Sequence, residues 1–298
     1  MHGSCSGKGV VGENRPLRRV VAGLRRWVAR VDGSLEPRTR WWWRCPSRRS
    51  GWLARSRRPH SQEPVSFCGD RCRSATVDFC NDRCGSTTKQ LVELGHIVYV
   101  GARDVERGQK AAAVLGARFV RLDVTDDASV SSALATIDAA EGRLDVLVHN
   151  AGVLGDGVPD GPTALRAFDT NAVGIVRVTE AALPLLRRSS NPNVVTVSSS
   201  AGSFWAVTNP ERPEFGLPLA LYSASKSAAT MLTVQYAKSQ PGIKFNAVEP
   251  GTTATDMTAA FGIGRSPEES ARTVVRLAIL GADGPTGTFQ DETGELPW

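Results

Sequence analysis

Residues 86–281 alternate between two kinds of segment: short apolar runs rich in β-branched side chains, and longer runs with helical periodicity. Short apolar runs without polar alternation predict strands that are buried on both faces, as in parallel sheets. Regular alternation of strand and helix predicts an α/β fold with one doubly wound parallel sheet in three layers. The predicted strands are 96–101, 118–123, 144–150, 193–199 and 243–250, and the predicted helices are 86–95, 105–116, 126–142, 162–188, 219–239 and 266–281.

Polar side chains stand at or just beyond the carboxyl ends of these predicted strands. They are Arg103, Asp123, Asn150 and Ser199. In doubly wound sheets a ligand binds outside the carboxyl ends of the strands, close to the point where the strand order reverses. We therefore expect these four residues to line one site.

Tyr222 and Lys226 stand four residues apart in the sequence YSASK, within one predicted helix. This spacing places both side chains on one helix face, about 6 Å apart. A phenol ordinarily has a pKa of about 10, but a neighbouring ammonium stabilises the phenolate and lowers the pKa of the phenol. The pair is therefore a candidate acid–base device for alcohol chemistry, with Ser199 as a hydrogen-bond partner for the reacting oxygen. Taken alone, either feature also fits an ordinary exposed helix face or a polar strand end.

Five motifs in sequence order resemble the classical short-chain dehydrogenase/reductase (SDR) family, over about residues 86–298. They are HNAG at 149–152, FDTNAVG around Asn171, VSSSAG around Ser199, YSASK, and NAVEPGTTATDM after the last predicted strand. The resemblance implies a Rossmann-type, single-domain oxidoreductase with Tyr222 as general acid/base and Ser199 orienting the carbonyl. It also implies that Lys226 lowers the tyrosine pKa and binds the nicotinamide ribose, while Asn171 holds a relay water. The implied cofactor contacts are Asn150, Ala151, Gly152, Lys226, Pro250, Gly251, Thr253 and Thr255.

Two positions within these motifs leave a choice. Ser199 is preferred as the motif serine, with Ser198 and Ser200 as weaker alternatives. His149 stands where the family has its first asparagine, and we expect a packed, hydrogen-bonded side chain there rather than a catalyst. The family mechanism uses no zinc, and we expect no metal site.

The choice of cofactor depends on the end of the predicted strand 96–101. An acidic residue there would bind the ribose 2′-hydroxyl of NAD(H), whereas the sequence continues Gly101-Ala102-Arg103. A guanidinium favours a 2′-phosphate, so we expect NADP(H) to be preferred over NAD(H). The alternative is that Arg103 is a solvated loop residue. Asp123 matches the family residue that meets the adenine ring, or else it caps the following helix.

The segment between Ser199 and Tyr222 is longer than is usual in the family, which resembles carbonyl-reductase-like members. Phe204, Trp205 and Phe215 either form the wall of an apolar pocket for a ketone or aldehyde, or simply pack the loop. The region 256–266, where the family carries a substrate lid, is short, so we expect an open site and broad specificity.

The glycine-rich phosphate loop of the family, TGxxxGxG, is expected at residues 77–84, where the sequence reads VDFCNDRC. Such a loop needs glycine because the backbone must approach the pyrophosphate closely and present its N–H groups. Asp78 and Asp82 place negative charge there instead. This departure leads to an alternative function, a cofactor-binding-impaired SDR homologue that acts as a non-catalytic binding protein.

Residues 1–84 differ in composition from the rest of the chain. They carry 17 Arg and 1 Lys against 7 acidic residues, together with all six cysteines and five of the seven tryptophans. We predict a basic extension over 1–73 that is disordered or non-native, followed by the SDR domain over 74–298. GC-rich DNA translated out of frame gives a composition of this kind, and we hypothesise that origin for residues 1 to about 84. A targeting or membrane-surface helix, a nucleic-acid contact and a zinc site at Cys68, Cys72, Cys80 and Cys84 are the weaker alternatives.

The remaining expectations concern partners and location. No apolar run is long enough to span a bilayer, and a cysteine-free body from residue 85 onward fits a cytoplasmic protein. We expect a small carbonyl or alcohol substrate and no nucleic-acid partner. The family resemblance suggests a homodimer or homotetramer, although carbonyl-reductase-like members also occur as monomers.

Overall fold

The computed structural model describes residues 75–79, 82–155, 159–255, 257–258, 262 and 264–298. The chain divides into two units, Met1–Pro64 and Val65–Trp298, and all described residues belong to the second. The predicted extension over 1–73, its boundary with the domain and the cysteine cluster therefore lie outside what the structure describes, apart from the backbone of Cys84.

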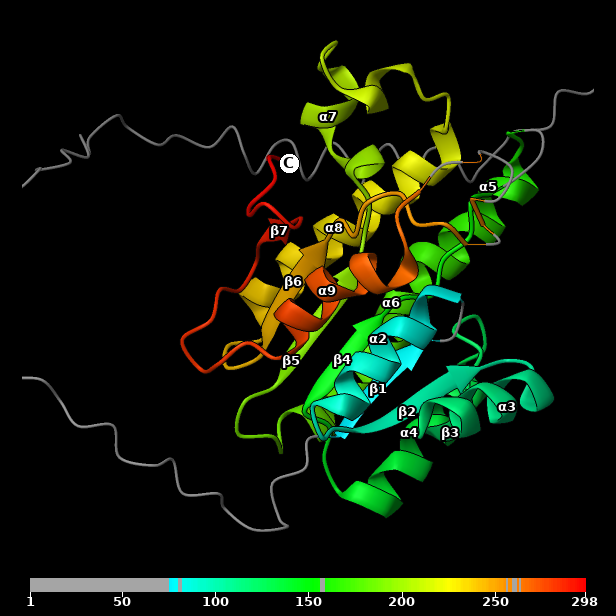
Figure 1. Cartoon of the computed structure of the whole chain (residues 1–298), viewed down its shortest axis with the longest axis vertical. Helices are drawn as coiled ribbons and strands as arrows, with labels where there is room; N and C mark the ends of the chain where they lie inside the picture. The colour runs from blue at the N-terminus through cyan, green and yellow to red at the C-terminus, as the bar shows by residue number, and fades with distance from the viewer. Residues whose placement is uncertain (1–74, 80–81, 156–158, 256, 259–261, 263) are drawn as a thin grey trace, which may run out of the picture. The chain divides into compact units, whose positions relative to one another are not determined.

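The described domain is built on one seven-stranded sheet in the order β3-β2-β1-β4-β5-β6-β7 (Figure 1). Every neighbouring pair is parallel, which confirms the predicted doubly wound fold. The order reverses between β1 and β4, so the crevice that binds ligands in such sheets opens at their carboxyl ends. The strands are β1 (Ala75–Phe79), β2 (Ile97–Ala102), β3 (Arg118–Arg121), β4 (Val146–His149), β5 (Asn193–Val197), β6 (Lys244–Val248) and β7 (Phe289–Gln290).

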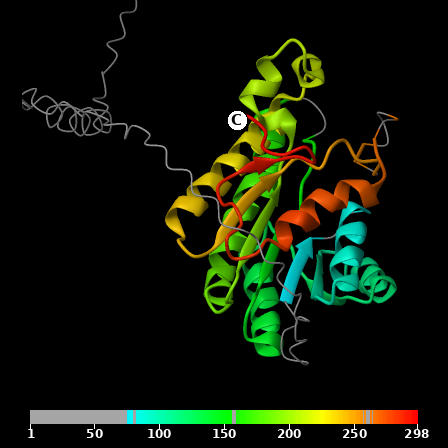
Figure 2. The same cartoon turned by 60° about the vertical axis from the view of Figure 1, so that its left-hand side comes forward.

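Helices cover both faces of the sheet (Figures 1 and 2). One face carries α2, α3 and α9, and the other carries α4, α6 and α8. The main helices are α2 (Asp82–Glu93), α3 (Val105–Leu115), α4 (Asp127–Glu141), α5 (Gly161–Phe168), α6 (Gly174–Leu186), α8 (Ala220–Ser239) and α9 (Pro267–Ala278). No helix in the described part of the chain is long and apolar enough to cross a membrane.

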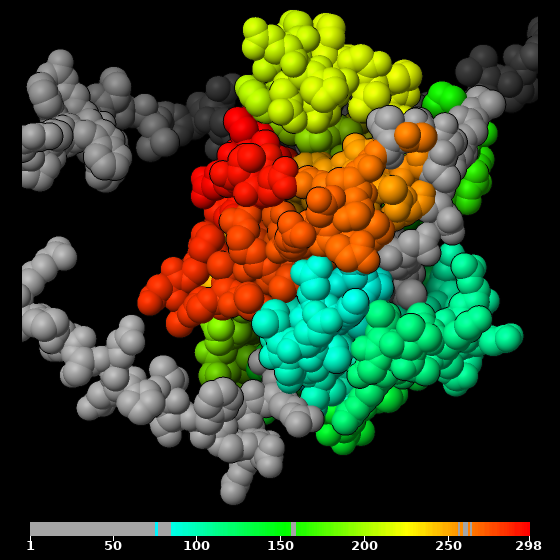
Figure 3. Space-filling view, in the orientation of Figure 1, coloured from blue at the N-terminus to red at the C-terminus, as the bar shows by residue number. Residues whose placement is uncertain are grey.

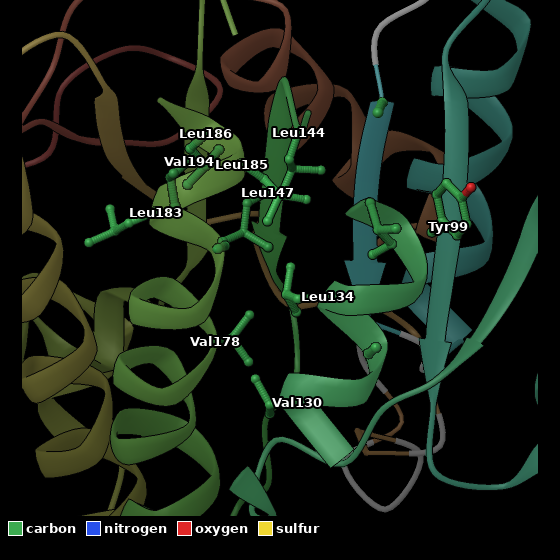
Figure 4. Packing of buried hydrophobic residues seen from close by; sticks show 14 of the residues in the cluster. Tyr99, Val130, Leu134, Leu144, Leu147, Val178, Leu183, Leu185, Leu186 and Val194 are labelled. Atoms are coloured by element: carbon green, nitrogen blue, oxygen red, sulfur yellow. The ribbon is translucent and has the colours of Figure 1, made fainter. Parts of the chain in front are cut away.

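The strands are apolar on both faces because each face meets a layer of helices. In β4, Leu147 packs into the cluster beneath α4 and α6 (Figure 4), whereas Val146 and Val148 pack into the cluster beneath α2 and α9. Full burial of a valine or leucine side chain contributes about 1.5–3 kcal/mol. These two cores hold the strand ends in a fixed register, and the strand ends carry the candidate site.

The predicted helix 162–188 is interrupted. The chain passes from α5 into a π-helical turn, η1 (Asp169–Val173), and then into α6. A π-turn accommodates one extra residue and rotates the side chains that follow it, and such turns are frequent at functional sites. Asn171 lies in this turn, so the interruption determines where its side chain points.

Candidate active site

Tyr222 and Lys226 both lie on α8, and the Lys226 ammonium is 5.7 Å from the centre of the Tyr222 ring. The same ammonium donates a hydrogen bond to the carbonyl oxygen of Val197, the last residue of β5, over 2.7 Å. Only 5% of Lys226 is exposed. A buried charge of this kind is held by its hydrogen bonds, so the lysine is fixed between the helix and the sheet.

Asn171 is buried and joins η1 to the loop that follows β4. Its side-chain oxygen accepts the N–H of Val153 over 2.8 Å, and its amide donates to the Val153 carbonyl over 2.8 Å and to Ser225 Oγ over 2.9 Å. A Cβ atom added at Gly152 would lie 3.4 Å from Lys226 Nζ and 3.5 Å from Asn171 Oδ1. The structure therefore brings Asn171, Gly152 and Lys226 together at the carboxyl end of β4.

The three serines after β5 have different surroundings. Ser198 is buried, and its hydroxyl lies 2.6 Å from Thr230 Oγ1 on α8. Ser199 is partly exposed, and its oxygen accepts the N–H of Ala201 over 3.2 Å. Because that bond occupies an acceptor site of the Ser199 hydroxyl, its proton is left to donate outward. This arrangement favours Ser199 over Ser198 as the residue that meets a carbonyl oxygen.

Ser199 is followed by a short 3-10 turn, η2 (Ser200–Gly202), which packs against α8. A Cβ atom at Gly202 would lie 2.7 Å from the backbone of both Lys226 and Ser227. Only glycine permits this approach. Gly202 therefore sets the distance between the serine segment and the helix that carries the tyrosine and lysine.

The PG motif forms a loop after β6. Gly251 has a φ of 77°, a conformation that favours glycine, and its N–H donates to Glu249 Oε1 over 2.6 Å. Thr253 is fully buried, with its hydroxyl 3.0 Å from the Gly251 carbonyl and 2.7 Å from Ser270 Oγ. Thr255 lies in the turn, where its N–H donates to Thr258 Oγ1. In this conformation the Thr253 hydroxyl supports the loop from within.

The residues expected at the adenosine end lie at the carboxyl ends of β2 and β3. Arg103 is exposed directly after β2. Burial opposes ionisation of Asp123, but hydrogen bonds from Thr125 and the nearby charges of Arg103 and Arg121 outweigh burial and hold the pKa of Asp123 below its usual value. Asp123 does not cap α4, because Asp126 occupies that position.

His149 is buried at the end of β4, and its Nε2 lies 2.9 Å from Thr179 Oγ1 on α6. Burial lowers the pKa of His149 to about 3, so the ring is neutral at physiological pH. The expectation of a packed, hydrogen-bonded histidine is confirmed.

The long segment after Ser199 forms α7 (Phe204–Thr208) and a 3-10 turn, η3 (Pro213–Gly216), which extend beyond the strand ends (Figure 1). Phe204 is 72% exposed and Phe215 is 56% exposed, so neither is packed within the loop. The Trp205 ring lies under the Arg212 guanidinium, 5.4 Å away. The Trp205 N–H donates to the carbonyl of Trp298, which places the C-terminal segment beside this insertion (Figure 3).

A cavity of about 460 Å³ lies along α9, and its lining does not include Tyr222. Arg265 connects it to the site, because the Arg265 guanidinium covers Gly251 and pairs with Glu292. The residues that line this cavity are Arg265, Glu269, Arg272, Thr273, Arg276 and Glu292.

Two acidic residues of the site were not singled out from the sequence. Glu249 accepts the N–H groups of Ser200 and Gly251. Glu214 is buried, is paired with Arg212, and is hydrogen-bonded by Ser200. An acidic residue between an apolar strand and a Pro-Gly pair was the available signal for Glu249, whereas nothing local distinguishes Glu214.

The segment expected to hold the phosphate loop spans the junction of β1 and α2. Only its backbone is described, with β1 ending at Phe79 and α2 beginning at Asp82, and residues 80–81 lie outside the described residues. The contacts of the side chains at 77–84 are therefore not part of the description, and the effect of the missing glycines stays a prediction.

A parallel sheet of this order is typical of Rossmann-type nucleotide-binding enzymes, and here Ser199 follows β5 while Tyr222 and Lys226 lie on the adjoining α8. The family model for short chain dehydrogenase matches residues 85–265. A short-chain dehydrogenase/reductase of Stachybotrys chlorohalonatus is 36% identical over 233 residues, covering 67% of this chain and 83% of that protein.

Two solved structures share the fold. Salutaridine reductase from Papaver somniferum has a TM-score of 0.64 at 29% identity, covering 73% of this chain and 99% of that one. NADPH-bound carbonyl reductase from chicken fatty liver has a TM-score of 0.67 at 22% identity, covering 76% and 100%. The chain belongs to the short-chain dehydrogenase/reductase family and is an oxidoreductase acting on carbonyl or alcohol groups, as the motifs predicted.

Proposed function

We propose that the chain is an NADP(H)-dependent oxidoreductase that interconverts a ketone or aldehyde and the corresponding alcohol, with Tyr222 as general acid/base. The observation that carries the proposal is the position of the buried Lys226 ammonium, 5.7 Å from the Tyr222 ring. A positive charge there favours the phenolate, which suits a tyrosine that gives and takes a proton near neutral pH.

Different residues of the chain have different roles in carbonyl reduction. Ser199 donates a hydrogen bond to the carbonyl oxygen, and Tyr222 transfers its hydroxyl proton to that oxygen as the carbon–oxygen π electrons move onto it. Lys226 stabilises the phenolate that remains, and Asn171 fixes the loop after β4 in place. The loops after β4 and β6, together with Lys226, would hold a nicotinamide cofactor, whose chemistry would be the supply of the hydride for the carbonyl carbon.

The residues at the nicotinamide end fit such a cofactor. Gly152 presents no side chain beside the Lys226 ammonium, so a ribose can approach the lysine there. Asn150, Ala151 and Pro250 lie in the same two loops, which follow β4 and β6. These two loops therefore form the proposed contacts to the nicotinamide end of the cofactor. Thr253 supports the loop after β6 from within.

The preference for NADP(H) rests on Arg103. Arg103 is exposed at the carboxyl end of β2, and it does not cap α3, because Asp104 does. The Asp104 side chain accepts the N–H of Arg107 as the N-cap of α3, so its carboxylate is engaged in capping the helix. A guanidinium in that position suits a 2′-phosphate.

The departure at residues 77–84 supports the second candidate, an SDR homologue that binds a ligand without turnover. The two candidates are separated by titrating NADPH into the full-length chain by fluorescence and measuring ketone-dependent NADPH oxidation. A companion variant carries Asp78→Gly, Asp82→Gly and Cys84→Gly. Under the enzyme proposal the chain binds NADPH and reduces ketones, and the glycine variant binds NADPH more tightly. Absence of binding at millimolar NADPH in both proteins rejects the enzyme proposal.

The family resemblance also supports a homodimer or homotetramer, with a small carbonyl or alcohol compound as substrate. The absence of cysteine from residue 85 onward supports a location in the cytoplasm. Analytical ultracentrifugation of the purified chain measures the assembled mass. A single species at the monomer mass across the micromolar range rejects the oligomer.

A further inference from the structure

Glu249 follows the last residue of β6 and precedes the Pro-Gly pair. Its backbone N–H donates to the Gln290 carbonyl over 2.8 Å, which extends the pairing of β6 with β7. Its side chain is half-buried and engages two backbone amides at once. One carboxylate oxygen accepts the N–H of Gly251 over 2.6 Å, and the other accepts the N–H of Ser200.

These two amides belong to the two loops on which the proposed reaction depends. Ser200 directly follows Ser199, and Gly251 belongs to the loop proposed to face the nicotinamide. Backbone N–H groups that donate to a carboxylate form charge-assisted bonds, which are shorter and stronger than neutral ones. The Glu249 carboxylate therefore ties together the ends of β5 and β6 at the points where they enter the site.

The Ser200 N–H is one of the amides at the start of η2 that have no partner within the turn. The Glu249 carboxylate accepts this N–H, and Ser199 Oγ accepts the next N–H, from Ala201. With both amides engaged, the peptide between Ser199 and Ser200 has one orientation. That orientation leaves the Ser199 hydroxyl proton free to donate away from the turn.

Glu214, which lies in the insertion, provides a second carboxylate that holds Ser200. Ser200 is hydrogen-bonded to Glu214, whose other contacts are the Arg212 guanidinium at 3.0 and 3.1 Å. Burial opposes ionisation of Glu214, but these interactions hold its pKa below the usual value. Glu214 therefore restrains the segment from the insertion, whereas Glu249 links it to the Gly251 loop.

We propose that Glu249 is a positioning residue for the carbonyl reduction, which acts through Ser199 by holding the Ser200 and Gly251 amides at a fixed separation. This role rests on the proposed function, because the linkage matters for catalysis only if Ser199 meets the carbonyl oxygen and the Gly251 loop faces the nicotinamide. Glu249 itself makes no contact with the reacting atoms in this role.

The experiment compares Glu249→Gln, Ser199→Ala and the double variant in steady-state ketone reduction, with thermal unfolding of each protein. Glutamine has the shape of glutamate but accepts one N–H and opposes the other with its own amide. We expect kcat to fall by about 10- to 100-fold in Glu249→Gln at a temperature where thermal unfolding shows the variant to be fully folded. The double variant is expected to be no slower than Ser199→Ala, because coupled residues are not additive. Glu211→Gln, the same change at an exposed glutamate in the insertion after Ser199, serves as the control.

Independent effects of Glu249→Gln and Ser199→Ala, multiplying in the double variant, would overturn the proposal. A readout without turnover keeps this test separate from the proposed function. Amide hydrogen exchange by NMR is expected to accelerate at Ser200 and Gly251 in Glu249→Gln, while Ala201 keeps its protection. Unchanged exchange at Ser200 and Gly251 overturns the proposal even in a chain that turns over no ketone. Faster exchange in a chain without activity supports the linkage and rejects the enzyme.

Discussion

The Lys226 ammonium lies 5.7 Å from the centre of the Tyr222 ring and is fixed there by a 2.7 Å hydrogen bond to the Val197 carbonyl. The helix sets the spacing of the two side chains, and the sheet sets the position of the charge. The position of the charge beside the tyrosine therefore depends on how α8 packs against β5.

Tyr222→Phe removes the hydroxyl but keeps the ring beside Lys226. We expect kcat for ketone reduction to fall by about 10²- to 10⁴-fold, the usual contribution of a positioned acid or base. NADPH affinity, measured by fluorescence titration, should change little because the ring and the lysine remain. A variant that retains near-full kcat would show that another group supplies the proton.

Gly202→Ala tests the close approach of η2 to α8. The added Cβ would lie 2.7 Å from the backbone of Lys226 and Ser227, so the helix or the serine segment must move. Overpacking of this kind costs about 1–3 kcal/mol of the free energy of unfolding, measured by urea denaturation. Activity should fall together with stability, because the displacement separates the serine from the tyrosine.

The matched control for that change is Gly216→Ala, in the same insertion. A Cβ there meets nothing within 4 Å, and the backbone requires no glycine. Its unfolding free energy should stay within about 0.5 kcal/mol of the unchanged protein. Equal losses in the two variants would contradict the role given to the Gly202 approach.

His149 predicts a specific acid sensitivity. Its pKa falls from an ordinary 6.5 to about 3 on folding, so between these pH values the unfolded chain binds a proton that the folded chain does not. The stability that depends on this neutral ring is fully present above pH 6.5 and is lost as the pH falls toward 3, at up to about 1.4 kcal/mol per pH unit.

His149→Gln removes this titration while keeping a side-chain amide near the position of Nε2, where it can hydrogen-bond to Thr179. We therefore expect the unfolding free energy of the variant to depend less steeply on pH between 6.5 and 4 than that of the unchanged protein. Parallel urea titrations across this range measure the difference. Equal pH slopes would mean that other groups dominate the acid sensitivity.

Arg103→Ala tests the basis of the cofactor preference. A hydrogen bond to a charged group contributes about 1.5–3 kcal/mol, so loss of the guanidinium should raise KM for NADPH by roughly 10- to 100-fold. KM for NADH should change little, because NADH has no 2′-phosphate. Arg107→Ala, on the first turn of α3, is the control, and an equal rise in that variant would indicate only a loss of general positive charge.

Much of the fold could be predicted from the sequence because its signals are local. The strands β2 to β6 and the helices on both sides follow from hydrophobic periodicity, which short segments carry by themselves. The π-turn at Asn171 could not be predicted, because the helical pattern of the sequence continues through it. The extra residue is stabilised only by packing against the loop after β4. β7 was also missed, because its two residues carry no period.

The sequence by itself determined the strands β2 to β6, the family and the pairing of Tyr222 with Lys226. That pairing follows because four residues along a helix place two side chains on one face. Only the tertiary structure decided which serine is available and what holds it there. Ser200 and Glu249 are 49 residues apart, and their contact exists because β5 and β6 pair in register and bring two loops to one edge. The Glu249 carboxylate bonds to backbone amides, which almost every residue has, so the contact cannot be read from the sequence pattern after β5 or β6. Only the folded chain brings Glu249 to Ser200.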